Sequence, residues 1–73
     1  MGAVPINTLR LKENDYIFDD ETGDLTIPNS ISRLIDSDCD YVEVEFIEEE
    51  NQTHFPKFKV HRGYKATRLE YIG

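Results

Sequence analysis

The chain has 73 residues, and its fifteen Asp and Glu against eight Lys and Arg give a formal net charge of −7. A chain of this length forms one domain and buries only about 60% of its unfolded surface, so its core alone provides little stability. The charge repels nucleic acid and anionic membranes and attracts basic partners, and no apolar stretch approaches the roughly 20 residues of a membrane-spanning helix.

The chain contains one cysteine, Cys39, so no intramolecular disulfide can form. Cys and His do not cluster as they do in structural metal sites, and we expect neither a metal nor a cofactor. A homodimer is therefore the stabiliser that we expect. Residues 1–6 contain neither a basic segment nor a long apolar run, and together with the lone cysteine they predict a cytoplasmic protein without a signal peptide.

The N-terminal third predicts three short strands. Residues 9–12 alternate apolar and basic side chains, residues 16–18 are rich in β-formers, and residues 25–27 form a third apolar segment. The acidic segment 20–24 has the composition of a turn between the second and third strands.

A helix is predicted over about 29–37. Pro28 suits a position at its start, and Asn29 or Ser30 can cap it. The apolar face that the helical spacing predicts consists of Ile27, Ile31, Leu34 and Ile35.

Residues 41–48 and 55–61 predict a hairpin, because both segments alternate apolar and charged side chains at a period of two. The predicted register pairs Val44 with Phe58, Glu45 with Lys57 and Glu43 with Lys59. Each cross-strand ion pair of this kind stabilises a sheet by about 0.2–1 kcal/mol. Glu48 to His54 forms the connecting loop in this interpretation.

Arg62 and Gly63 predict a tight turn into a last strand over residues 64–72, with Leu69 and Tyr71 facing the core. The predicted fold class is α+β and β-rich, with five or six short antiparallel strands and one short helix (about 29–37), dimeric, in a single domain that spans residues 1–73.

The segment 36–40 copies the D-x-D-x-D opening of a calcium-binding loop. Such a loop needs a glycine at the next position and a bidentate glutamate at its twelfth, where this chain has Tyr41 and Ile47. We therefore predict an acidic loop between helix and strand without calcium.

No residue stands out as catalytic. The aspartates that flank Cys39 disfavour its thiolate, which predicts a structural thiol. His54 and His61 lie far apart along the predicted hairpin, and no carboxylate has the apolar sequence context that tunes a general acid or base. We expect a binding protein and not an enzyme.

The charge is bipolar along the chain. Residues 13–50 contain fourteen acids and one base, whereas residues 51–73 contain five bases and one acid. After removal of the hairpin acids, the candidate partner-binding residues are Asp19, Asp20, Glu21, Asp24, Asp36, Asp38, Asp40, Glu48, Glu49 and Glu50. The C-terminal aromatic and basic residues also suit a nucleic-acid stacking face, although the total charge favours a core and ion pairs for them.

Residues 23–28, a short helix and residues 40–46 resemble the AbrB/MazE swapped-hairpin family, in which a strand ending in Ile-Pro leads to a helix and then to a strand opened by Asp. The resemblance implies a dimer that binds DNA through basic residues on its N-terminal strands. In this chain the matching region carries Asp19, Asp20, Glu21 and Asp24 instead.

In its short length, acid density and lone cysteine the chain also resembles the small DNA-mimic proteins of bacteriophages, such as inhibitors of the HU nucleoid protein. This resemblance implies a protein that works in the host cytoplasm, where it binds a basic DNA-binding protein and blocks its DNA-binding surface. Two alternatives remain: a swapped-hairpin antitoxin or transcription regulator that binds DNA through Arg10, Lys12 or the C-terminal strands, and a structural protein that self-associates through its bipolar charge.

Overall fold

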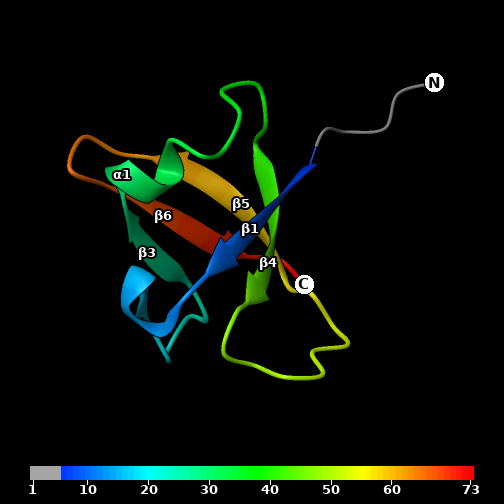
Figure 1. Cartoon of the computed structure of the whole chain (residues 1–73). Coiled ribbons are helices and arrows are strands. Elements are labelled where there is room, and N and C mark those ends of the chain that lie inside the picture. The colour runs from blue at the N-terminus through cyan, green and yellow to red at the C-terminus, as the bar shows by residue number, and fades with distance from the viewer. Residues whose placement is uncertain (1–5) are drawn as a thin grey trace.

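The computed structural model describes residues 6–73 (Figure 1). Residues 1–5, which belong to the segment predicted to lack a targeting signal, lie outside the described residues. The strands are β1 (Ile6–Leu11), β2 (Ile17–Phe18), β3 (Leu25–Pro28), β4 (Tyr41–Phe46), β5 (Lys57–Arg62) and β6 (Ala66–Tyr71). The helices are the 3-10 helix η1 (Glu13–Asp15) and the α-helix α1 (Asn29–Ser32). The predicted β-rich fold with one short α-helix is confirmed, and no helix of the described chain is long and apolar enough to cross a membrane.

All six strands belong to one sheet in the order β1-β4-β5-β6-β3-β2. Four pairings are antiparallel, but β1 lies parallel to β4, with Ile6 opposite Tyr41 and Leu11 opposite Phe46. The prediction of antiparallel strands throughout is wrong for this pair. A parallel pair needs a long crossover connection, which residues 12–40 provide. The prediction could not detect this pair, because the alternation of side chains within one strand is the same whether the neighbouring strand is parallel or antiparallel.

The sheet curls because its two edge strands are joined by a short connection. Leu11 of β1 and Ile17 of β2 are six Cα steps apart, which reach at most about 22 Å. The edges of a flat six-stranded sheet would lie about 24 Å apart, and η1 shortens the connection further. The curl visible in Figure 1 is therefore imposed by chain connectivity.

The core lies inside the curl and is built from alternate residues of the strands. Its buried members are Leu9, Leu11, Leu25, Ile27, Ile35, Cys39, Val42, Val44, Phe58, Val60 and Leu69. Leu69 is buried as predicted, whereas Tyr71 is 49% exposed and packs against the core residue Phe58 in a T-shaped arrangement. The alternation thus also predicted the buried face of β4, with Val42 and Val44, and of β5, with Phe58 and Val60.

The helix is much shorter than predicted. It ends at Ser32, and Leu34 and Ile35 continue in tight turns whose amides donate to carbonyls three residues earlier. Ile35 reaches the core but Leu34 is 71% exposed, so the predicted apolar face is wrong for Leu34. Asn29 does not cap the helix either, because its side chain bonds to the β5–β6 turn instead.

The predicted hairpin of β4 and β5 forms, but with a register shifted by two residues. Val42 pairs with Phe58, and Glu43 pairs with Lys57. A shift of two leaves every side chain on its own face, so alternation cannot detect it. The predicted pairs Glu45–Lys57 and Glu43–Lys59 are therefore corrected.

The register predicted from pairs of opposite charge was wrong because β4 has a second neighbouring strand, β1. Arg10 of β1 lies 3.7 Å from Glu45, and Thr8 of the same strand donates a hydrogen bond to Glu43. The parallel strand thus supplies the partners that the prediction assigned to β5.

Candidate functional site

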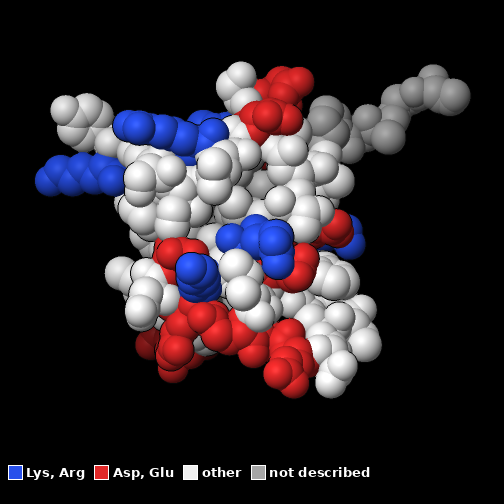
Figure 2. Space-filling view, viewed as in Figure 1, with Lys and Arg blue, Asp and Glu red and all other residues white. Residues whose placement is uncertain are grey.

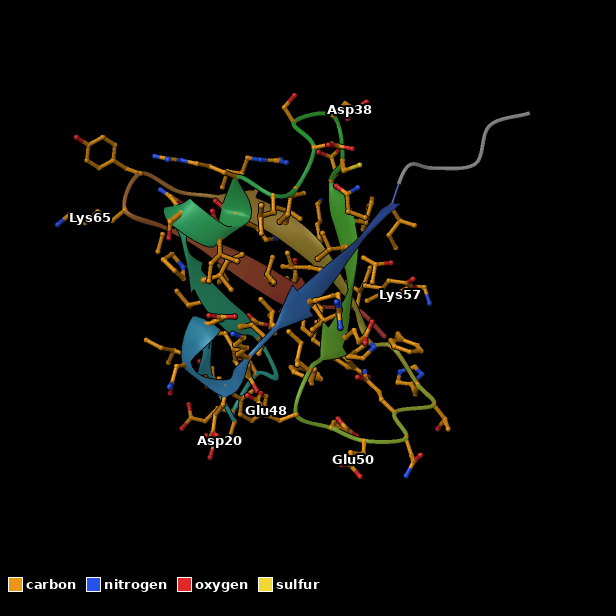
Figure 3. All side chains as sticks on the ribbon, in the orientation of Figure 1. Asp20, Asp38, Glu48, Glu50, Lys57 and Lys65 are labelled. Carbon is orange, nitrogen blue, oxygen red and sulfur yellow. The ribbon has the colours of Figure 1, made fainter. Side chains whose placement is uncertain are left out.

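Exposed carboxylates gather at one end of the molecule, where η1, the β2–β3 turn and the β4–β5 loop meet. Figure 2 shows them along the lower end, and Figure 3 places Asp20, Glu48 and Glu50 there. These residues, named the acidic face below, are Glu13, Asp19, Asp20, Glu21, Glu48, Glu49 and Glu50. None of them takes part in the ion pairs found among the described residues, which are Arg10–Glu45, His61–Glu70 and Arg68–Asp24.

The β4–β5 loop, which carries three of these acids, is held by Gln52. The side-chain oxygen of Gln52 accepts a hydrogen bond from the amide of Phe46 (2.8 Å), and its nitrogen donates to the carbonyls of Val44 (3.1 Å) and His54 (2.9 Å). The side chain thus takes the place of a strand residue beside the end of β4. Sequence reasoning predicted the loop but gave Gln52 no role.

A further hydrogen bond joins the loop to η1. The backbone amide of Glu13 donates to Oε1 of Glu48 at 2.9 Å. Residues 35 positions apart in the sequence therefore lie side by side, so the acidic face is a tertiary feature and not a run of sequence.

Asp24 belongs to the same end, but its negative charge is paired with the guanidinium of Arg68. Its carboxylate accepts hydrogen bonds from the amide of Tyr71 and from the guanidinium of Arg68, both at 3.1 Å. The Tyr71 amide, followed by Arg68, lowers the pKa of Asp24 against an opposing effect of burial. Asp24 therefore anchors the β2–β3 turn to β6 and is not one of the free acids that the sequence analysis assumed.

The third predicted acidic segment, 36–40, lies elsewhere. Figure 3 places Asp38 at the end opposite Asp20 and Glu50. Asp36 exchanges hydrogen bonds with the Asn7 side chain of β1. The ten predicted partner-binding residues thus fall into two groups, and no single contact of modest size covers both.

The 36–40 loop contains a group of potential metal ligands among the described residues, formed by Asp36, Asp38 and Cys39 with ligand atoms within 4.8 Å of one another. The guanidinium of Arg62 donates to the carbonyls of Asp36 (2.9 Å) and Cys39 (3.0 Å), which places a positive charge against the same loop. Cys39 is buried, and burial, followed by Asp38 and Asp36, raises the pKa of its thiol. A protonated thiol beside a guanidinium is a poor cation ligand, so this arrangement agrees with a structural role for Cys39.

An apolar groove opens between the segments of the acidic face. It has a volume of about 700 Å³ and contains five of the eight aromatic side chains of the protein. The residues that line it are Glu13, Tyr16, Phe18, Gly23, Leu25, Phe46, Glu48, Glu49, Pro56, Phe58 and Tyr71. None of these described residues is a lysine, an arginine or a histidine.

Two aromatic pairs build the floor of the groove. Tyr16 packs on Phe46 with ring centroids 5.5 Å apart, and Phe58 packs edge-on against Tyr71 at 5.7 Å. Burial raises the pKa of the Tyr16 phenol, and Glu13, Glu48 and Glu49 raise it further. These three glutamates therefore act electrostatically on an aromatic ring that lines the groove.

Sequence reasoning missed this groove. Its residues come from η1, all strands except β1, the β2–β3 turn and the β4–β5 loop, and only the curl brings them together. The only signal in the sequence is an aromatic residue at strand ends next to acids, as at Phe18 and Phe46, and that signal cannot be told from ordinary core residues without the topology.

Some of the basic residues gather at the other end, around the β5–β6 turn, whereas Lys12 directly precedes η1 of the acidic face. The β5–β6 turn carries Arg62 and Lys65 on either side of Tyr64, which is 97% exposed. Figure 2 shows Lys and Arg gathered at the upper left, where Figure 3 labels Lys65. A Cβ at Gly63 would collide with the carbonyl oxygen of Ala66, so the turn requires glycine there. The acidic face and the basic β5–β6 turn thus lie at opposite ends of the molecule, and the acidic 36–40 loop lies toward the same end as the turn.

Comparisons of the chain with protein-family models, with curated proteins and with solved structures find no match.

Proposed function

We propose that the protein is an acidic DNA mimic that binds a basic DNA-binding protein, of the HU nucleoid type, and blocks its DNA-binding surface. The observation that carries the proposal is the gathering of seven exposed acids from three separate segments on one face, outside every ion pair of the described residues. Charges left unpaired on one face attract a cationic surface and speed its association.

Each of the three segments is held in place by hydrogen bonds, which supports binding and not only solubility. Gln52 holds the β4–β5 loop, the Glu13 amide binds Glu48, and Asp24 ties the β2–β3 turn to β6. Fixed charges lose little conformational entropy when a partner docks. B-DNA presents one charge per about 1.7 Å of its axis, and two copies of the acidic face approach such a density better than one.

The test is a competition assay with purified HU nucleoid protein and labelled duplex DNA at several salt concentrations. We expect the protein to displace the DNA, and we expect its affinity for HU to fall steeply with salt because the Debye length is only about 8 Å at physiological ionic strength. Salt-independent binding, or simultaneous binding of DNA and this protein to HU, would contradict the proposal.

Two matched triple variants locate the contact. Neutralising Glu48→Gln, Glu49→Gln and Glu50→Gln together removes three charges from the acidic face, whereas Asp36→Asn, Asp38→Asn and Asp40→Asn remove three from the opposite end. We expect the first variant to weaken binding much more than the second, mainly through the association rate. Equal losses would show that only net charge matters and would remove the acidic face from the proposal.

A second candidate function is self-association through opposite charges. The observation that favours it is the basic β5–β6 turn with the exposed Tyr64, at a distance from the acidic face of the same copy. Head-to-tail contacts of this kind would extend beyond dimers, so sedimentation at low salt would show larger species that dissociate when salt is added. The third alternative, DNA binding of the swapped-hairpin type, predicts a mobility shift of duplex DNA by the protein alone.

A further inference from the structure

The aromatic side chains that line the groove favour an apolar occupant. Phe18 and Tyr71 line the groove and remain 57% and 49% exposed, so an apolar group placed against them would remove aromatic surface from water. The volume of about 700 Å³ lies within the range of sites that hold a small ligand or a few side chains.

The glutamates at the rim of the groove favour a positively charged occupant. Glu13, Glu48 and Glu49 stand around the opening, and none of the described residues that line the groove carries a positive charge. One oxygen of Glu48 is already bonded to the Glu13 amide, which leaves its other oxygen and the whole Glu49 carboxylate for an occupant. An anionic occupant is excluded by the same charges.

An arginine side chain provides both the positive charge and a flat surface that packs on aromatic rings. Its planar guanidinium stacks on aromatic rings and donates two parallel hydrogen bonds to a carboxylate, which the compact ammonium of lysine cannot do. The groove is larger than one such side chain, so apolar residues beside the arginine would share it. We propose that the groove is the anchor point of the basic partner and takes an arginine flanked by apolar residues; this inference rests on the proposed function.

The chain offers two matched pairs of variants for a test. Glu49 and Glu50 are adjacent acids, but only Glu49 lines the groove; Phe18 and Ile17 are adjacent exposed apolar residues, but only Phe18 lines it. We expect Glu49→Gln and Phe18→Ala to weaken HU binding about fivefold or more, the order expected for losing a charge-assisted hydrogen bond or a cation–π contact. Glu50→Gln and Ile17→Ala should change it less than about twofold, as is typical for an exposed charge or side chain away from the contact.

A peptide titration tests the groove without the partner. The probes are the capped pentapeptide Gly-Leu-Arg-Leu-Gly, the same peptide with the neutral citrulline in place of arginine, and Gly-Ala-Arg-Ala-Gly. NMR titration should show that only the first shifts the resonances of Tyr16 and Phe18 substantially, and that Phe18→Ala abolishes the effect while Ile17→Ala does not. Equal shifts with the citrulline peptide, or shifts centred on residues outside the groove, would overturn the inference.

The two proposals fail separately. If HU binds in a salt-dependent manner but the members of each matched pair behave alike, the groove inference is wrong and the acidic face stands. If HU does not bind but the arginine peptide fills the groove, the proposed partner is wrong and the groove inference stands, with a different arginine-bearing protein as its occupant.

Discussion

The side-chain oxygen of Asn29 accepts a hydrogen bond of 2.9 Å from the hydroxyl of Thr67, which joins the start of α1 to the start of β6. Thr67 is 1% exposed and is the buried polar residue of the described chain. The same Asn29 side chain donates to the carbonyls of Gly63 and Tyr64 at 3.2 and 3.0 Å. One amide group therefore satisfies polar groups of both β6 and the β5–β6 turn at this end of the sheet.

We expect Asn29→Ala to lower the free energy of unfolding by about 1–3 kcal/mol, because it leaves the buried Thr67 hydroxyl and two turn carbonyls without their partner. The control is Ser30→Ala at the neighbouring exposed position, which should stay within about 0.5 kcal/mol of the original protein. Urea denaturation followed by circular dichroism measures both. Equal stabilities of the two variants would mean that the amide contributes nothing beyond what water can replace.

Asn29 also illustrates how far the sequence predicts the fold. Its type and position predicted a helix cap, because local hydrogen bonding is all that a single sequence reveals about an asparagine. Apart from the Ser32 hydroxyl, which donates to the side-chain oxygen of Asn29, its partners are 34 to 38 residues away. Period-two alternation predicted the strands of the hairpin and their buried faces, since that pattern depends only on each strand itself. Strand order, the parallel β1–β4 pair and the register of Val42 with Phe58 depend on other strands and were not predictable.

In the candidate site too, the sequence predicted local features but not those that depend on distant segments. The sequence predicted which acids are exposed, as at Asp20 and Glu49, because carboxylates without a partner stay in water. It did not predict that Arg68 neutralises Asp24, 44 residues away, or that the 36–40 loop lies at the other end. The groove was missed because a half-buried aromatic such as Phe46 has the same sequence signature as a core residue.

Asp24 should make stability depend on pH in the acid range. Its folded-state pKa lies below the ordinary value of about 3.9, so the folded state holds this carboxylate charged where the unfolded state begins to bind a proton. The stabilisation is fully present above that ordinary value and is lost as pH falls through it toward the folded-state pKa. We expect unfolding curves between about pH 5 and 2 to show a shallower loss of stability in Asp24→Asn than in Asp20→Asn, which removes an exposed carboxylate from the same turn. Parallel curves for the two variants would show that the contacts with Tyr71 and Arg68 do not favour the charged form.

Gln52→Ala should free the β4–β5 loop. The substitution leaves the amide of Phe46 and the carbonyl of Val44 without their side-chain partner, and we expect it to lower the unfolding free energy by about 1 kcal/mol. Because both groups lie next to the loop, hydrogen exchange at Phe46 should accelerate more than exchange at Val60 of the core. The exposed neighbour Thr53→Ala is the control and should change neither quantity. A Gln52→Ala protein with unchanged exchange at Phe46 would show that the β1–β4 pairing fixes this region by itself.

The last prediction concerns association. The core consists of eleven side chains without a disulfide, and Leu34 and Ile72 are 71% and 50% exposed, so burial against a second copy would add stability that the monomer lacks. We expect sedimentation at micromolar concentration to give about twice the 8.5 kDa of one chain. Salt then separates the two possible kinds of contact: a dimer held by apolar surface persists as salt rises, whereas a contact between the acidic face and the β5–β6 turn dissociates as screening increases. The variant Leu34→Asp should abolish the first kind if the segment after α1 takes part, and Lys65→Glu should weaken the second. A monomer at every salt concentration would contradict the dimer and leave a single acidic face, with one groove, to carry the whole interaction with the partner.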